Sequence, residues 1–124
     1  MALKLSIYRY GTPRKRGEGL RIGTTRFLPR GVAKKDYARL DYFDVWLPLL
    51  APSRDLLYWY RDGDRTAAEF YRRYRKEMSE TDARQTIAVL AALAQKTPIA
   101  VGCFCEDESR CHRPVLHKLI AAAK

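Results

Sequence analysis

A short apolar run near the C-terminus is the strongest guide to the fold. Pro98 precedes Ile99-Ala100-Val101-Gly102-Cys103, five small or apolar residues in succession. A continuous run of this kind is typical of a strand that is covered on both faces, as in a parallel sheet. An amphipathic segment follows it and predicts a helix. The end of the chain therefore predicts a strand-helix unit of an α/β protein.

Three more strands are expected upstream. Residues 3–8 alternate in polarity, residues 20–27 form a second run, and residues 42–47 are rich in aromatic and branched side chains. The order of strands, then helices, then a final strand and helix suggests a three-layer α/β domain. We expect residues 1–124 to form this single compact domain, with a small, mostly parallel sheet.

The helices between these strands are predicted from their capping residues. Ser53 is positioned to cap a short helix. Thr66 with Glu69 forms a capping-box pattern that opens a longer helix, and Ser79 with Asp82 forms a second one. Apolar residues recur at helical spacing after both patterns.

Composition and charge indicate a protein that attracts anions. The chain has no apolar run near the roughly 20 residues needed to span a bilayer, and its first residues lack the apolar core of a signal peptide. We therefore expect a cytoplasmic protein without a membrane segment. The formal net charge is +10, and residues 1–39, here called the basic third, hold eleven lysines and arginines against two acids. Such a region attracts phosphates, whether free, in nucleotides or in nucleic acid, although a solvated basic face is the plainer interpretation.

All three cysteines lie in the segment that joins the last strand to the last helix. Cys103 ends the strand, Cys105 follows it, and Cys111 with His112 and Arg113 marks the expected start of the helix. The junction between a strand end and a helix start is where ligands bind in open α/β sheets. An odd number of clustered cysteines does not fit a disulfide framework, so we expect reduced thiols.

Three chemistries compete for this segment. Its cysteines and His112 offer the sulfur and nitrogen donors that zinc prefers, but adjacent Cys111 and His112 rarely share one ion. Alternatively, the positive end of the helix dipole and the neighbouring arginines would lower the pKa of Cys111 and make it a nucleophile. The thiols could also simply pack the junction, which suits Cys103 best. We take Cys111 and His112 as the candidate catalytic residues, with no metal and no cofactor.

The segment from Cys103 to Arg113 resembles the C-terminal signature of family 488 among the domains of unknown function (DUF488). Its small YeaO-like members also show an Arg-hydrophobic-hydrophobic-Pro-Arg-Gly segment, which stands here at residues 26–31. The resemblance spans essentially the whole chain, and it implies a compact α/β fold with an unassigned activity. Many members have Glu in place of Cys105, which implies that sulfur is not required there. The residues that carry over are Arg26, Arg30, Cys103, Cys111, His112 and Arg113.

The arginines around Pro29 suggest what the site binds. Arg26 and Arg30 would be costly to bury without anionic partners. One possible partner is the acidic segment 106–108, which would make a structural salt-bridge cluster. The other is a bound phosphate or nucleotide, held by these arginines, Arg113 and the start of the last helix.

These features leave three candidate functions. The first is an enzyme acting on a nucleotide or other phosphorylated substrate, with Cys111 as nucleophile or His112 as general acid or base. The second is a nucleic-acid-binding module that uses the basic third and stacks bases on Tyr8 or Tyr10. The third is an interaction protein without chemistry, which docks a partner on the aromatic residues between positions 42 and 60.

Overall fold

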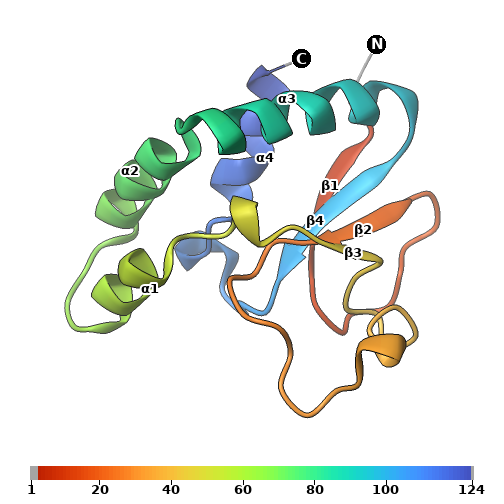
Figure 1. Ribbon diagram of the computed structural model, residues 1–124, viewed down its shortest axis with the longest axis horizontal. Helices are drawn as coiled ribbons and strands as arrows, with labels where there is room; N and C mark the ends of the chain where they lie inside the picture. Colours follow the sequence, from red (N-terminus) through yellow and green to blue (C-terminus); the bar gives the residue numbers. More distant parts are fainter. Residues whose placement is uncertain (1–2, 124) are drawn as a thin grey trace.

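The computed structural model describes residues 3–123, which form a four-stranded parallel sheet packed against helices (Figure 1). The strands are β1 (Leu5–Arg9), β2 (Leu20–Gly23), β3 (Val45–Trp46) and β4 (Ile99–Cys103). The helices are α1 (Arg54–Arg61), α2 (Ala67–Met78), α3 (Thr81–Lys96) and α4 (Arg113–Ala122). The predicted α/β class with a parallel sheet is confirmed. Within residues 3–123, no helix combines the length and the apolarity that crossing a bilayer requires.

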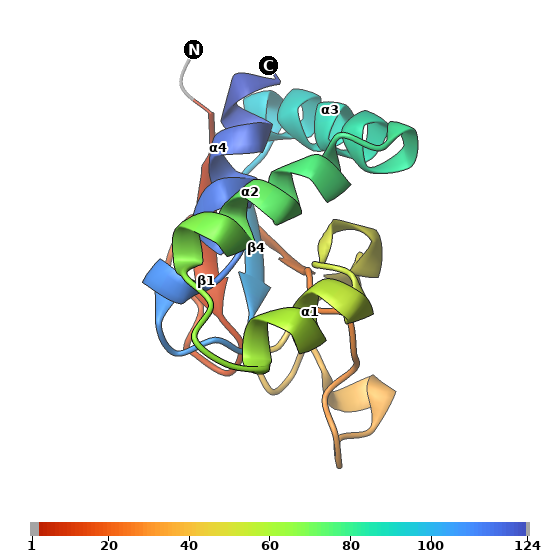
Figure 2. The same cartoon turned by 90° about the vertical axis from the view of Figure 1, so that its left-hand side faces the viewer.

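The last strand of the chain occupies an internal position in the sheet. The strand order is β1-β4-β2-β3, and β4 is buried at all five of its positions, as its apolar run predicts. Figure 2 shows β1 and β4 side by side. Because all four strands are parallel, their carboxyl ends meet at one edge, where Arg9 pairs with Cys103 and Gly23 pairs with Gly102. The cysteine segment therefore begins at the edge where ligands usually bind.

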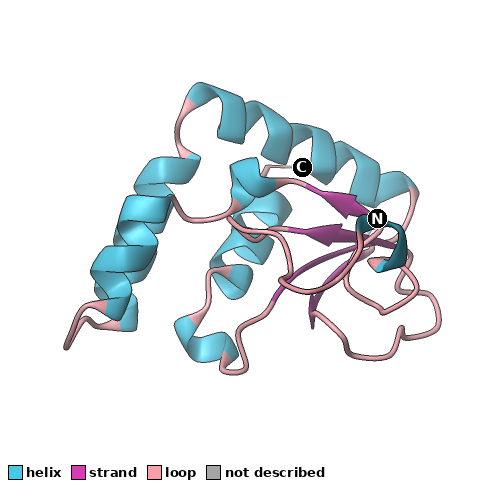
Figure 3. Ribbon diagram, turned by 60° about the horizontal axis from the view of Figure 1, so that its bottom comes forward, coloured by secondary structure: helices cyan, strands magenta, loops and turns pink. Residues whose placement is uncertain are grey.

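The two faces of the sheet are covered in different ways. Ile22, Ile99 and Val101 belong to a core that draws buried side chains from all four helices. On the opposite face, Tyr8 and Ala100 pack with aromatic side chains of the loop between β2 and β3. Figure 3 shows the long helices to one side of the strands and the loops gathered to the other. The three layers are therefore helices, sheet and an aromatic loop layer.

Most helix starts lie where the capping residues predict them. The Ser53 hydroxyl accepts a hydrogen bond from the third residue of α1, at 3.1 Å, and Thr66 does the same for α2, at 3.2 Å. The prediction that Ser79 caps the next helix is wrong. Ser79 instead closes α2, where its hydroxyl donates to the Lys76 carbonyl, and α3 begins two residues later at Thr81. Ser79 keeps a helical backbone, so its hydroxyl bonds backward to the preceding turn.

Candidate active site

A pocket of about 670 Å³ opens at the carboxyl edge of the sheet. Its wall comes from three parts of the chain: the loop after β2, helix α1 with Pro52 before it, and the segment from Cys103 at the end of β4 to the start of α4. The first contributes Arg26 and Arg30, α1 contributes Arg61, and the third contributes Cys105 and His112. The arginine motif and part of the Cys-His-Arg motif, which are about 80 residues apart in sequence, thus line one cavity.

His112 is 5% exposed and is held by the end of β2. Its Nε2 lies 2.9 Å from the carbonyl oxygen and 3.0 Å from the hydroxyl of Thr24, and that hydroxyl donates to the Gly102 carbonyl. A carbonyl oxygen only accepts, so Nε2 carries the proton of the neutral ring and Nδ1 is the accepting nitrogen. Nδ1 faces the Cys111 sulfur at 3.7 Å. Burial lowers the pKa of His112 to about 4, so the ring is neutral at pH 7.

The three thiols differ in exposure and in acidity. Cys103 and Cys111 are 2% and 1% exposed, with their sulfurs 2.8 Å apart, whereas Cys105 is exposed on the pocket wall. Hydrogen bonds from Cys103 and Cys111 lower the pKa of Cys105, and the charge of Arg113 acts in the same direction. The same hydrogen bonds, with burial, raise the pKa of Cys103. Although the contact with Cys103 lowers it, the Cys105 thiol and burial raise the pKa of Cys111 to about 11. The expectation that the helix start and the neighbouring arginines give Cys111 a lowered pKa is therefore wrong, and Cys105, the thiol that solvent reaches, is the most acidic of the three.

Arg113 is a buried cation that holds the cysteine segment in place. Its side chain is 1% exposed and donates to the carbonyls of Tyr8, at 2.7 Å, and Cys105, at 2.6 Å, while its Nε lies 3.3 Å from the Cys111 sulfur. Among residues 3–123, no carboxylate forms an ion pair with it. Arg113 is not part of the pocket wall, so its predicted contact with an anion stays a prediction.

Arg26 and Arg30 do not pair with the acidic segment 106–108. Arg26 is half-buried and donates to two backbone carbonyls just before α1, at 3.0 and 3.1 Å, while Arg30 is exposed. Glu106 pairs instead with Arg9, at 3.2 Å. The salt-bridge cluster considered from the sequence is therefore absent from the described residues. Burial of Arg26 is compensated by carbonyl oxygens, and both arginines face the cavity.

Cys103, Cys111 and His112 are the side chains best placed to hold a metal ion, with ligand atoms within 4.8 Å of one another. Two sulfurs bound to a tetrahedral zinc at about 2.3 Å would lie about 3.7 Å apart. The observed separation of 2.8 Å is about 1 Å shorter than that, and the Arg113 cation contacts one of the two sulfurs. This geometry differs from that of a zinc site with two thiolate ligands.

Some of the wall was missed by reasoning from the sequence. Thr24, which fixes the His112 ring, is fully buried at the end of β2 and carries no motif. Arg61 and Leu57 line the pocket from α1 and are four residues apart, so they share a helix face. That spacing is the one sequence signal that could have placed Arg61 beside the site.

Comparison with known proteins identifies the family. Residues 5–124 match the family model described as DUF488-N3a, the active DUF488-N3 subclade. The chain belongs to the DUF488 family. This DUF488 protein is 27% identical over 103 residues to uncharacterised proteins of Mycobacterium tuberculosis and Mycobacterium bovis, covering 83% of its own length and 81% of theirs. No solved structure matches it. The resemblance predicted from the Cys-His-Arg segment is confirmed.

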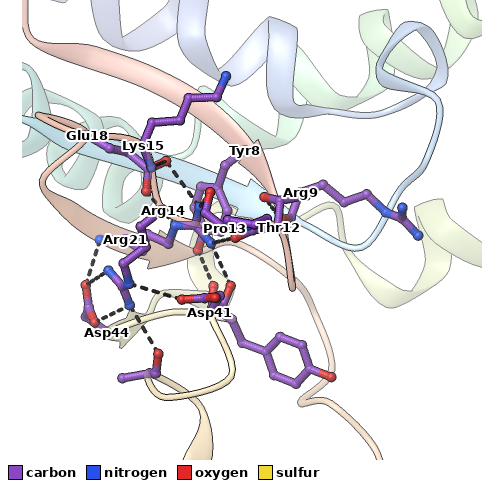
Figure 4. A network of polar contacts seen from close by, with 12 residues as sticks. Tyr8, Arg9, Thr12, Pro13, Arg14, Lys15, Glu18, Arg21, Asp41 and Asp44 are labelled. Atoms are coloured by element: carbon purple, nitrogen blue, oxygen red, sulfur yellow. Dashed lines mark hydrogen bonds and ion pairs between the residues drawn. The ribbon is translucent and has the colours of Figure 1, made fainter.

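Part of the positive charge in the basic third of this DUF488 protein is neutralised by ion pairs within the protein. Arg21 is fully buried, pairs with Glu18 at 2.5 Å, and lies 4.1 Å from the centre of the Tyr8 ring. Arg14 binds both carboxylate oxygens of Asp44, at 2.8 and 2.9 Å (Figure 4). These cations hold the loops of the aromatic face together. Nucleic-acid binding by the basic third stays a prediction.

The aromatic residues considered for stacking or docking belong mainly to the core. Tyr8 and Tyr10 are each 5% exposed, so neither ring is open to stack a base, and Phe43 is equally buried. Tyr58, in contrast, is 47% exposed and lines the pocket. Tyr58 is therefore an exposed aromatic ring that lies at the cavity.

Proposed function

We propose that this DUF488 protein is an enzyme that binds a nucleotide, or another phosphorylated molecule with a ring, and acts on it with its Cys-His-Arg segment. The observation that carries the proposal is the composition of one pocket. Arg26, Arg30 and Arg61 line the same cavity as His112 and Cys105. Cations that bind an anion and groups that exchange protons are thus within reach of one small ligand.

The wall suits both parts of such a ligand. Guanidinium groups bind phosphate oxygens with two parallel hydrogen bonds, which favours arginine at phosphate sites. Phe27 and Tyr58 line the pocket and are 48% and 47% exposed, so their rings are available to a base. The volume of about 670 Å³ is in the usual range for small-molecule sites.

The chemistry is assigned by access to the cavity. His112 lines the pocket, and its neutral ring is able to accept a proton, although a pKa of about 4 makes it a weak base at pH 7. Cys111 is not part of the wall and contacts the accepting Nδ1 of that ring. We therefore assign His112 to proton transfer, and Cys111 and Arg113 to its positioning.

Ligand binding is the first test. AMP, adenosine and inorganic phosphate should be compared by calorimetry and by thermal unfolding. AMP at about 100 times its Kd would raise the unfolding free energy by about 2.7 kcal/mol, and adenosine should bind far more weakly. Replacing Arg30 by Ala removes a charge-assisted hydrogen bond worth about 1.5 to 3 kcal/mol, so affinity should fall about tenfold or more.

Arg75→Ala is the matched control, because Arg75 is exposed on α2 and lies outside the pocket wall. Equal affinity of Arg30→Ala and the unaltered protein for AMP would refute the assignment of the pocket. Turnover is then followed by NMR with a panel of nucleoside phosphates. His112→Gln should abolish product formation and leave AMP affinity within about threefold. Failure of the unaltered protein to convert any binding compound would exclude the enzymatic part of the proposal.

A further inference from the structure

Two buried thiols meet where the last strand joins the last helix. Cys103 is the final residue of β4, Cys111 directly precedes the N-cap of α4, and their sulfurs are 2.8 Å apart. Nonbonded carbon atoms, which are smaller than sulfur, pack best at about 3.5 to 4.0 Å, whereas the sulfurs of a disulfide are about 2.05 Å apart. The distance between these two sulfurs therefore lies between that of a packing contact and that of a covalent bond.

The surroundings of Cys111 suit a sulfur that forms a new bond. Arg113 is buried, and its Nε donates to the Cys111 sulfur at 3.3 Å. Among residues 3–123, no carboxylate balances that guanidinium, so its charge stabilises negative charge that develops on Cys111. On the other side, Nδ1 of His112 lies 3.7 Å from the same sulfur and accepts its proton in a hydrogen bond. A cation and a proton acceptor thus contact one sulfur.

Cys103 connects this pair of thiols to the cavity. It lines the pocket although it is only 2% exposed, whereas Cys111 is not part of the wall. A hydroperoxide is far smaller than the volume of about 670 Å³ that the pocket offers. An oxidant of this class therefore meets Cys103 from the pocket and has Cys111 directly behind it.

We propose that Cys103 and Cys111 are a redox modification site, which closes to a disulfide when a hydroperoxide enters the pocket. The Cys103 sulfur bonds the outer peroxide oxygen as the O–O bond breaks, and its proton leaves with the departing oxygen as alcohol or water. Cys103 is then a sulfenic acid, oxidised by two electrons. The Cys111 sulfur displaces the hydroxyl group, the S–S bond forms, and the departing hydroxide takes the Cys111 proton to become water. An external dithiol restores both thiols by exchange.

The disulfide would join the sheet to the segment that holds His112. The backbone of Cys103 is fixed by the pairing of β4 with β1 and β2, so the new bond ties the start of α4 to an internal strand. Oxidation also removes the S–H group that Cys111 presents to Nδ1 of His112. The environment of the ring therefore differs between the two redox states. This proposal goes beyond the proposed function and does not rest on it.

The test uses the full-length Cys105→Ser protein, because Cys105 is exposed on the same wall and would react in parallel. The reduced protein is treated with excess hydrogen peroxide, denatured and alkylated. Both remaining thiols should escape alkylation, the intact monomer should be lighter by two hydrogen atoms, and dithiothreitol should restore both thiols. Two free thiols after treatment, or oxygen added to either sulfur in place of a bond between them, would overturn the proposal.

Peptide mapping then locates the bond in the unaltered protein. Trypsin should release residues 97–110 joined to residues 111–118, since the Arg113–Pro114 bond resists cleavage. Fragmentation should place the bond at Cys103, and a bond at Cys105 would overturn the assignment.

A matched variant tests the order of the two steps. Cys111→Ala in the Cys105→Ser background has no second sulfur, so dimedone should trap a sulfenic acid at Cys103. Absence of this adduct would overturn the role of Cys103 as the first sulfur. Stoichiometric zinc in the purified reduced protein would also overturn the proposal, because ligands of one ion are not free to bond each other. AMP binding is measured separately, so failure of the proposed function leaves this result unaffected.

Discussion

Mild acid should destabilise this protein through His112, which is buried as a neutral ring. Its pKa is lowered by burial from the ordinary 6.5 to about 4. The unfolded chain therefore binds more protons than the folded one between these values, and the stability present above pH 6.5 is lost as the pH falls. The loss that this one ring causes is about 2 kcal/mol at pH 5 and about 3 kcal/mol at pH 4. For a small domain this is a large part of the total stability.

Urea unfolding at pH 7, 6 and 5 measures this loss. The lowered pKa of Cys105 adds a dependence of the same sign, so the series is best run in a Cys105→Ser background. The carboxyls of Glu18 and Asp44 also have lowered pKa values and lose their stabilising charge only below about pH 4.5. The interval from pH 7 to 5 is therefore determined by the histidine.

His112→Gln should be less stable at pH 7 but should show almost no further loss at pH 5. His117→Gln is the matched control, because His117 is a partly exposed histidine of the same helix, α4. It should keep the loss of about 2 kcal/mol. A His112→Gln variant that loses as much stability as its parent would refute the reasoning, and so would a parent that is equally stable at pH 7 and 5.

Two further substitutions test the packing of the aromatic face. In Gly102→Ala the new Cβ would lie 2.4 Å from the Tyr8 ring; since that ring is buried, we expect a loss of about 1 to 3 kcal/mol in urea unfolding, and a change within 0.5 kcal/mol would contradict this. Glu18→Gln leaves the charge of Arg21 buried without its anion, which should cost about 3 to 5 kcal/mol. The exposed ion pair between Glu69 and Arg72 is the comparison, and Glu69→Gln should leave the midpoint of urea unfolding nearly unchanged.

The parts of the fold that the sequence predicts are those fixed by neighbouring residues. Helix starts at Ser53 and Thr66 follow from a side chain bonding an amide three residues on, and β4 follows from five consecutive apolar positions. The run at 20–27 is only half strand. It leaves the sheet after Gly23, where the Thr24 hydroxyl and amide both bond the Gly102 carbonyl. That contact spans 78 residues and has no local signature.

The candidate site likewise has features that local sequence predicts and features that depend on contacts between distant residues. The motifs containing Arg30 and His112 are visible in the sequence, and so is their chemical character. Their meeting in one cavity depends on the strand order, which places β2 beside β4. The exposure of Cys105 and the burial of Cys111 likewise depend on how the segment leaves the sheet. A single sequence predicts neither the strand order nor the exposure of these two cysteines.

The internal position of β4 also determines when this protein can fold during synthesis. Strand β1 pairs only with β4 within the described sheet, and β2 reaches β1 only through β4. Strand β1 must therefore wait on the ribosome without a sheet partner, and β2 with β3 alone, until residues 99–103 have emerged. Until then the apolar faces of α2 and α3 have no sheet to cover, and such surfaces favour aggregation. We expect the nascent chain to depend on chaperones up to the release of its last strand.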